Sequence, residues 1–150
     1  MCIRDSGGIA HLQLDDTRLS GTIPPSLVNV HAVMEDLDLD TTALSGTIPS
    51  ELWQVPTFQV VDFDNTRVSG TLSPSVSQLT NLRRLHFDTT AMSGTIPGQV
   101  ANLVKLRDFD VAGSRFSGTL PVSAFAQLTS LRECNSVSYT HLTLPTIYPV

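Results

Sequence analysis

Apolar residues recur along this chain in one arrangement that repeats about every 24 residues. In one copy, Leu37 and Leu39 alternate with Asp38, which is the pattern of a short strand with one buried face. A single strand of this length is not stable, whereas parallel copies stacked on one another bury a continuous apolar column. The pattern therefore predicts five parallel strands of one sheet, each with its first inward residue buried: Leu12, Leu37, Val61, Leu85 and Phe109.

A second part of the repeat follows each strand. The phrase LSGTIP recurs, unchanged or nearly so, at 19–24, 44–49, 68–73, 92–97 and 116–121. We expect Leu44 and Ile48 to point inward from the opposite wall, with Gly46 at a tight bend where a side chain would clash. Pro49 suits the first turn of a short helix. The three-residue apolar step that follows predicts a 3₁₀ or short α turn: Leu52, Val55 and Phe58.

A fixed period of this length indicates one supersecondary unit stacked on copies of itself. The unit resembles the plant-type leucine-rich repeat, L-x-L-x-x-N-x-L-S-G-x-I-P-x-x-L-x-x-L, over residues 9–134. The resemblance implies an α/β solenoid: a parallel sheet on the concave face, with second short strands and 3₁₀ or short helical turns on the other sides. It also implies a larger extracellular or cell-surface protein, such as a receptor-like ectodomain, a receptor kinase or a secreted inhibitor of the polygalacturonase-inhibitor kind.

One position departs from the family pattern. Hydroxyl residues replace the usual Asn in all five repeats: Thr17, Thr42, Thr66, Thr90 and Ser114. Asn can donate to and accept from buried backbone, whereas a hydroxyl supplies a single donor. We expect the ladder between repeats to survive with each rung somewhat weaker.

The two ends lie outside the repeat. Read as codons, MCIRD at 1–5 is the reverse complement of VSYTH at 137–141, and ATG for Met1 pairs with CAT for His141. This DNA resembles the transposase end of a short-read sequencing adaptor, and residues 142–146 fit the same adaptor read onward. We therefore interpret 1–6 and 136–150 as non-native artefact, and 7–135 as a leucine-rich repeat array of five repeats and the start of a sixth.

Composition then excludes several classes of function. The net charge of −5 argues against nucleic acid, which requires a basic face. No apolar run approaches the length of a membrane span. Cys134 falls at the first inward position of a sixth repeat, where we expect a small buried residue. The segment contains no signal peptide, and because a true N-terminus is missing this carries no meaning.

The sequence offers no catalytic constellation and implies no cofactor. Its usable histidines, His11, His31 and His86, lie in different repeats without a nucleophile at motif spacing, and we interpret them as polar surface. Neither a phosphate-binding glycine loop nor a Cys/His metal spacing occurs. We expect a non-catalytic module, which is compatible with a kinase domain elsewhere in the parent protein.

Acidic residues gather on the outward side of the predicted strands, the concave face of a leucine-rich repeat. Seven aspartates of this face and Asp16 account for eight of the thirteen carboxylates in residues 7–135. Like charges on strands about 4.8 Å apart repel by roughly 1 kcal/mol in water-like surroundings. We assign the candidate ligand-binding surface to one set of residues on this face: Asp15, Asp38, Asp40, Asp62, Asp64, His86, Asp88 and Asp110.

Two interpretations of these acids stay open. They can be solvated surface, partly paired with arginines along one edge of the face. Arg18 and Arg67 stand three residues after Asp15 and Asp64, and Arg115 stands three residues after Ala112. Alternatively they form a docking wall for a basic peptide or protein, or for Ca²⁺. A linear file of carboxylates is not a cage, which makes a dedicated metal site the weaker option, and we assign none.

A file of threonines supports a competing class of function. Thr22, Thr47, Thr71, Thr95 and Thr119 follow the five glycines and should form an outward file on the second wall. Such files resemble the faces of ice-binding solenoids, although Thr is also simply a good strand residue. Trp53 is expected either to pack on the convex side or to stand exposed. The leading prediction is a protein- or peptide-binding repeat module, and the alternative is a structural or surface-coat repeat with no specific partner.

Overall fold

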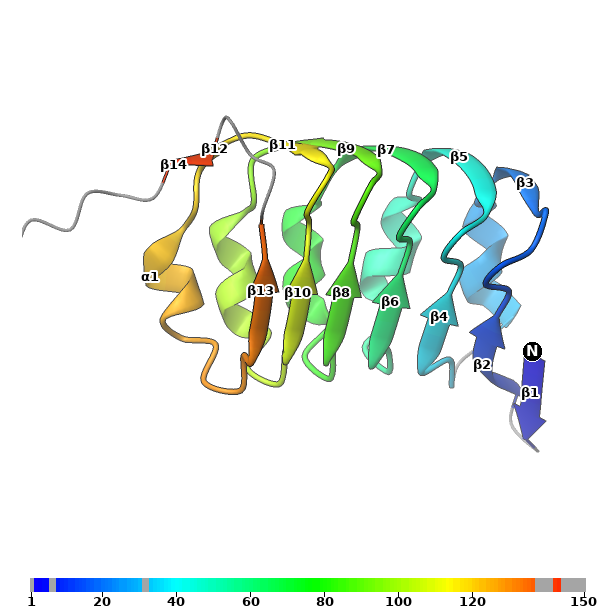
Figure 1. Cartoon of the computed structure of the whole chain (residues 1–150). Coiled ribbons are helices and arrows are strands. Elements are labelled where there is room, and N and C mark those ends of the chain that lie inside the picture. Colours follow the sequence, from blue (N-terminus) through cyan, green and yellow to red (C-terminus); the bar gives the residue numbers. More distant parts are fainter. Residues whose placement is uncertain (1, 6–7, 31–32, 137–141, 144–150) are drawn as a thin grey trace, which may run out of the picture.

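Successive repeats stack into a solenoid in which each turn of the coil adds one strand to each of two sheets (Figure 1). The computed structural model describes residues 2–5, 8–30, 33–136 and 142–143. The first sheet has the order β1-β2-β4-β6-β8-β10-β13. Its strands are β1 (Cys2–Asp5), β2 (Gly8–Gln13), β4 (Asp36–Asp38), β6 (Val60–Asp62), β8 (Arg84–His86), β10 (Asp108–Asp110) and β13 (Glu133–Asn135).

The predicted register of the first sheet is confirmed. From β2 to β13 all strands are parallel, and the five expected residues lie opposite one another, rung after rung. All five are buried: Leu12, Leu37, Val61, Leu85 and Phe109. In β4, β6, β8 and β10 the aligned residue is the middle one of three, so each strand begins one residue earlier than predicted.

The second sheet and the helical turns complete the coil, as predicted for a leucine-rich repeat. The second sheet contains β3 (Ser20–Thr22), β5 (Ala43–Thr47), β7 (Arg67–Thr71), β9 (Ala91–Gly94) and β11 (Arg115–Phe116). The turns are η1 (Pro25–Val30), η2 (Ser50–Gln54), η3 (Pro74–Gln78), η4 (Gly98–Asn102) and α1 (Val122–Phe125). Pro25 and Pro74 open their turns, whereas Pro49 caps η2 from the position before it.

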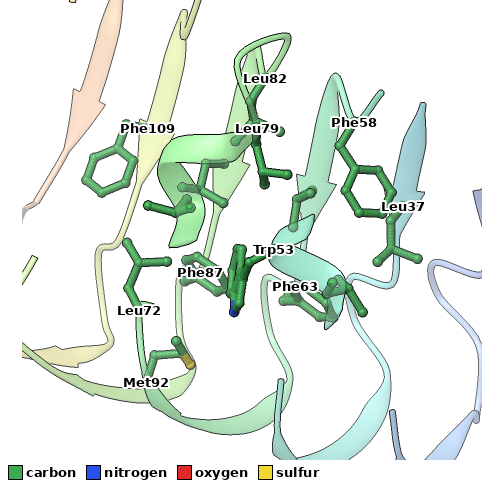
Figure 2. Close-up of a cluster of buried hydrophobic side chains, with 14 of the residues drawn as sticks. Leu37, Trp53, Phe58, Phe63, Leu72, Leu79, Leu82, Phe87, Met92 and Phe109 are labelled. Carbon is green, nitrogen blue, oxygen red and sulfur yellow. The ribbon is translucent and has the colours of Figure 1, made fainter. Parts of the chain in front are cut away.

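The core runs between the two sheets and the helical turns, and Trp53 belongs to it. Only 1% of the surface of Trp53 is exposed, so the expectation of a lone exposed aromatic is wrong. Its ring lies 6.4 Å from that of Phe87, which in turn stacks on Phe63 at 5.9 Å (Figure 2). These large rings from successive repeats interdigitate, and each would bury on the order of 150–250 Å².

The hydroxyl residues at the usual Asn position make the single bond that was expected of them. Each donates to the backbone carbonyl three residues earlier at 2.7–2.9 Å, and Thr42, Thr66 and Thr90 do so while buried. In the first and fourth repeats the hydroxyls of Thr17 and Thr90 also accept a longer bond of 3.4 Å, from the amides of Leu19 and Met92 respectively. Each hydroxyl therefore supplies one donor to a backbone carbonyl of its own loop.

The glycine of each LSGTIP phrase has positive φ, and from the second phrase on a threonine methyl of the preceding repeat also lies near it. Gly94 has φ +84, a region that side chains rarely adopt, and a Cβ there would lie 2.9 Å from the Cγ2 of Thr71. The same arrangement places Thr22 against Gly46. The predicted threonine file is exposed at Thr22, Thr47, Thr71, Thr95 and Thr119. Its methyl groups cover the glycine of the following repeat, which gives the file a packing role.

Both ends of the chain pair with the array. β1 runs antiparallel to β2, unlike any repeat strand of the described residues. Leu142–Thr143 forms β14, which pairs in parallel with β12 (Gly118–Thr119) as a repeat strand would. Interpreting 136–150 as non-native implies that this segment adds no repeat-like contact, and the parallel pairing of β14 contradicts that implication. The interpretation of both ends as translated adaptor rests on their codons and stays a prediction.

A recurring left-handed residue strains the bend after each concave strand. Asp16, Thr41, Asn65 and Thr89 have φ between 49° and 53°, and Gly113 has φ 65°. Asn and Gly tolerate this conformation, whereas a β-branched residue there is an outlier that costs on the order of 1 kcal/mol.

We expect Thr41→Asn to raise the free energy of unfolding by about 1 kcal/mol, because Asn65 already occupies the equivalent position of the next repeat. Urea denaturation would measure the change. Thr80→Asn is the matched control, at an exposed turn residue without positive φ. An equal gain in both variants would contradict the account of strain.

Candidate functional site

The candidate site lies on the exposed side of the first sheet and the bends that follow its strands, and we call this surface the concave face. Backbone hydrogen bonds between repeats hold its residues in register. The amide of Leu39 donates to the backbone carbonyl of Asp62, and the amide of Phe63 donates to the backbone carbonyl of His86. The next column is aligned in the same way, since the amides of Thr41 and Asn65 donate to Asp64 and Asp88. The acids predicted for one surface are therefore arranged in two adjacent files.

Three of these aspartates also terminate their strands. A side-chain oxygen of Asp38, Asp62 and Asp110 accepts from the backbone amide two residues further on, at 3.3, 3.0 and 2.9 Å respectively. This local bond is the Asx turn, which closes the end of a strand. Asp64 makes a different bond, accepting from the amide of Asp88 in the next repeat. These structural roles were not predicted, although Asp at a fixed offset after a strand residue is a sequence signal for them.

His86 joins two acids of the preceding repeat into one cluster. Its Nδ1 lies 3.2 Å from a carboxylate oxygen of Asp62 and 3.5 Å from one of Asp64. Asp62 is 7% exposed, and the side chains of Asp64 and His86 are about one-fifth exposed. The interpretation of His86 as solvated polar surface is therefore wrong. Its inclusion among the concave-face residues places it correctly.

The cluster shifts the pKa values of all three groups. Burial alone lowers the pKa of His86, but the hydrogen bonds and charges of Asp62 and Asp64 outweigh it and raise the pKa to about 9. Burial raises the pKa of Asp62, but the bonds from His86 and from the amide of Asp64 lower it below its ordinary value. For Asp64, burial dominates and the pKa is raised. At neutral pH the imidazolium therefore neutralises part of the acidic surface.

At Asp38 and Asp40 the described residues form no such ion pair. Burial, and then the charges of Asp62, Asp15 and Asp40, raise the pKa of Asp38 despite the bond from the amide of Asp40. The side-chain oxygens of Asp38, Asp40 and Asp62 all lie within 4.8 Å of one another. The same spacing holds for Asp62, Asp64 and His86. Protein donors already occupy several of these oxygens, so the clusters are not preformed cages for an ion.

Solved structures with this architecture come from plant receptors. The ectodomain of the receptor kinase SOBIR1 from Arabidopsis thaliana superimposes with a TM-score of 0.84 at 25% identity, over 91% of this chain and 74% of that one. The BIR2 ectodomain from Arabidopsis thaliana gives a TM-score of 0.73 at 31% identity, over 87% of this chain and 71% of that one. This chain belongs to the plant-type leucine-rich repeat family.

A third structure shows a leucine-rich repeat ectodomain of this kind in a complex. The ectodomain of GASSHO1/SCHENGEN3 from Arabidopsis thaliana, in complex with CASPARIAN STRIP INTEGRITY FACTOR 2, superimposes with a TM-score of 0.81 at 26% identity. The match covers 90% of this chain and 16% of that one, so this leucine-rich repeat array corresponds to a small part of the longer receptor. No family model and no curated protein matches the sequence.

The predictions for the arginines near the concave face and for Cys134 have different outcomes. Across the part of the chain that the structure describes, no ion pair joins Arg18, Arg67 or Arg115 to an aspartate, so the expected pairing is wrong. Arg67 and Arg115 begin strands of the second sheet and are exposed there. Cys134 lies in register with Phe109 as predicted, but it is exposed because β13 is the last strand of its sheet.

Two predictions concern the other histidines and the possibility of a membrane span. His11 pairs with Asp36 on the neighbouring strand, while His31 lies outside the described residues. Among the described helices, none has the length and apolar character that crossing a bilayer requires.

The shift at His86 makes stability depend on pH. The pKa in the folded protein is about 9, above the ordinary 6.5, so the stabilising contribution is complete below pH 6.5 and is lost as pH rises through about 9. We expect the difference in unfolding free energy between the parent and His86→Gln to be on the order of 2 kcal/mol at pH 6 and to fall to a small remaining difference at pH 10. Urea titrations at several pH values would measure it, and a constant difference would contradict the cluster.

Proposed function

We propose that this leucine-rich repeat array is the protein- or peptide-binding module of a larger extracellular protein, either receptor-like or secreted. Its binding surface would be the concave face, with Asp15, Asp38, Asp40, Asp62, Asp64, His86, Asp88 and Asp110 as the residues that meet a ligand. The observation that carries the proposal is the register of the first sheet, because it gathers the carboxylates of successive repeats onto one surface.

The electrostatics of the surface favour a basic ligand. The raised pKa values of Asp38 and Asp64 mean that burial makes their charged forms costly in the free protein. A Lys or Arg side chain brought to these carboxylates would offset that cost and lower both pKa values. Electrostatic complementarity of this kind contributes mainly specificity and rate of association.

The related structures support the same class of function. SOBIR1 and BIR2 provide ectodomains with this fold, and GASSHO1/SCHENGEN3 is seen in complex with CASPARIAN STRIP INTEGRITY FACTOR 2. Extended concave surfaces are what solenoids use for binding. An extracellular location follows for this chain by the same analogy, and the module itself would be non-catalytic.

The alternative function is a structural or surface-coat repeat, including one that binds ice through the threonine file. The exposure of Thr22, Thr47, Thr71, Thr95 and Thr119 is compatible with it. Their contact with the following glycines already accounts for threonine at these positions. An ice-recrystallisation assay tests the alternative. Inhibition by the parent chain that is lost in the variant with Thr47→Val and Thr71→Val would support it and count against a binding module.

The direct test of the acidic surface is Asp40→Asn combined with Asp64→Asn. We expect a basic peptide of about eight residues to bind the double variant at least fivefold more weakly at low salt, because two of the surface charges are gone. The free variant should be slightly more stable at neutral pH, by less than about 1 kcal/mol, since the charged form of Asp64 is disfavoured.

Glu51→Gln is the control for charge alone, because Glu51 lies in η2 on a different side of the coil. Fluorescence anisotropy with labelled oligolysine would measure binding, and urea denaturation would measure stability. If Glu51→Gln weakens peptide binding equally, or if the double variant binds as the parent does, the aspartates are solvated surface and not a binding site.

A further inference from the structure

The segments that form the second sheet in repeats two to five carry positive charge and no negative charge. These segments are 42–49, 66–73, 90–97 and 114–121, and their only charged residues are Arg67 and Arg115. Both arginines are exposed, and the described residues form no ion pair with either of them. The second sheet therefore differs in charge from the concave face, where aspartates predominate.

Arg67 lines an open hollow where the bends after the first-sheet strands lead into the second sheet. The hollow has a volume of about 410 Å³, and three exposed residues of successive bends line it together with Arg67: Thr41, Asn65 and Thr89. In the preceding repeat the position of Arg67 is occupied by Ala43, which also lines the hollow. The small side chain of Ala43 leaves space beside the guanidinium for a ligand.

The fold does not use the polar side chains of this hollow. Within the part of the chain that the structure describes, the side chains of Thr41, Asn65, Arg67 and Thr89 make no hydrogen bond and no ion pair. The guanidinium offers donors only, whereas the Asn65 amide and the two threonine hydroxyls both donate and accept. A ligand that matches the hollow therefore combines an anionic group with several groups that donate and accept hydrogen bonds.

The backbone of the hollow is already paired. The amides of Thr41, Asn65 and Thr89 donate to backbone carbonyls of the following repeat at 2.8–2.9 Å. An extended peptide that adds to a sheet gains its affinity from main-chain hydrogen bonds, which these amides no longer offer. Recognition by side chains suits a sugar, because nearly every ring carbon carries a hydroxyl. A uronic acid adds a carboxylate, which a forked guanidinium binds with two parallel hydrogen bonds.

We propose that this hollow binds a uronic-acid residue of an acidic polysaccharide. The carboxylate of the sugar pairs with Arg67, and its ring hydroxyls bond to Thr41, Asn65 and Thr89. The site lies outside the acidic concave face and takes a different class of ligand. It therefore adds a second binding surface to the proposed function and does not depend on it.

The nearest carboxylates weaken this site without occupying it. Asp40, Asp64 and Asp88 each precede one of the three bend residues and belong to the concave face, and none of them lines the hollow. Their charge repels an anion, so a general field does not attract the sugar. The paired contact with Arg67 has to supply the affinity, and replacing Arg67 is the decisive test.

The experiment compares two trisaccharides on the full chain by isothermal titration calorimetry at low salt. One is trigalacturonate, and the other is its methyl ester, which keeps the hydroxyls and removes the charge. We expect trigalacturonate to bind at least tenfold more tightly. Arg67→Gln should reduce that preference at least fivefold. Asn65→Asp should do the same by repulsion, since Asp also tolerates the left-handed conformation at this bend, where φ is 53°.

Arg83→Gln with Arg107→Gln is the control for charge, because both arginines are exposed and neither lines the hollow. This pair removes twice the charge and should change the preference less than twofold. Unchanged urea denaturation of Arg67→Gln would show that its lost binding is not lost folding.

Four outcomes would overturn the proposal. If neither trisaccharide binds, or if the methyl ester binds as tightly, the hollow does not recognise the carboxylate of a sugar. If the control pair reduces the preference equally, the effect is general electrostatics. If a glutamate trimer binds as tightly as trigalacturonate, the hollow belongs to an acidic peptide.

Discussion

The pairing of each repeat with the next is the interaction on which the rest of the structure depends. Strands of three residues with one fully buried apolar side chain cannot persist alone, and they become stable only where both neighbours bond to them and cover that residue. Leu37, Val61 and Leu85 are wholly buried for this reason. Leu12 retains some exposure and Cys134 is exposed, since they lie in the first and last of the six parallel strands.

The same ladder creates the charged surface. A column of residues held in register repeats its chemistry at a fixed spacing, so an aspartate that suits one bend is brought beside the aspartates of the next. The protein offsets part of the repulsion with backbone amides that donate to Asp38, Asp62, Asp64 and Asp110, and with the imidazolium of His86. Around Asp38 the repulsion is not offset, since burial and the neighbouring aspartates raise the pKa of its carboxyl despite the bond from the amide of Asp40.

Periodicity made the fold predictable, and interactions across repeats limited what else could be predicted. The positions of Leu37, Val61 and Phe109 follow from counting, because any other register would expose an apolar column. The pairing of His86 could not be predicted from spacing along the chain, because its partners lie one repeat away at nearly the same register position. Trp53 was ambiguous because a three-residue step fixes Leu52 inward but leaves the direction of its neighbour to tertiary packing.

Native-state hydrogen exchange of the strand amides tests the central claim, that stability comes from stacking between repeats. The account predicts that amides at the middle rungs, Val61 and Leu85, exchange only through global unfolding, since both neighbours protect them. The amide of Glu133, which begins the last strand of the sheet and donates to Arg107, should exchange through a smaller opening of that rung alone. Equal protection of all rungs, or faster exchange at Leu85 than at Glu133, would contradict it.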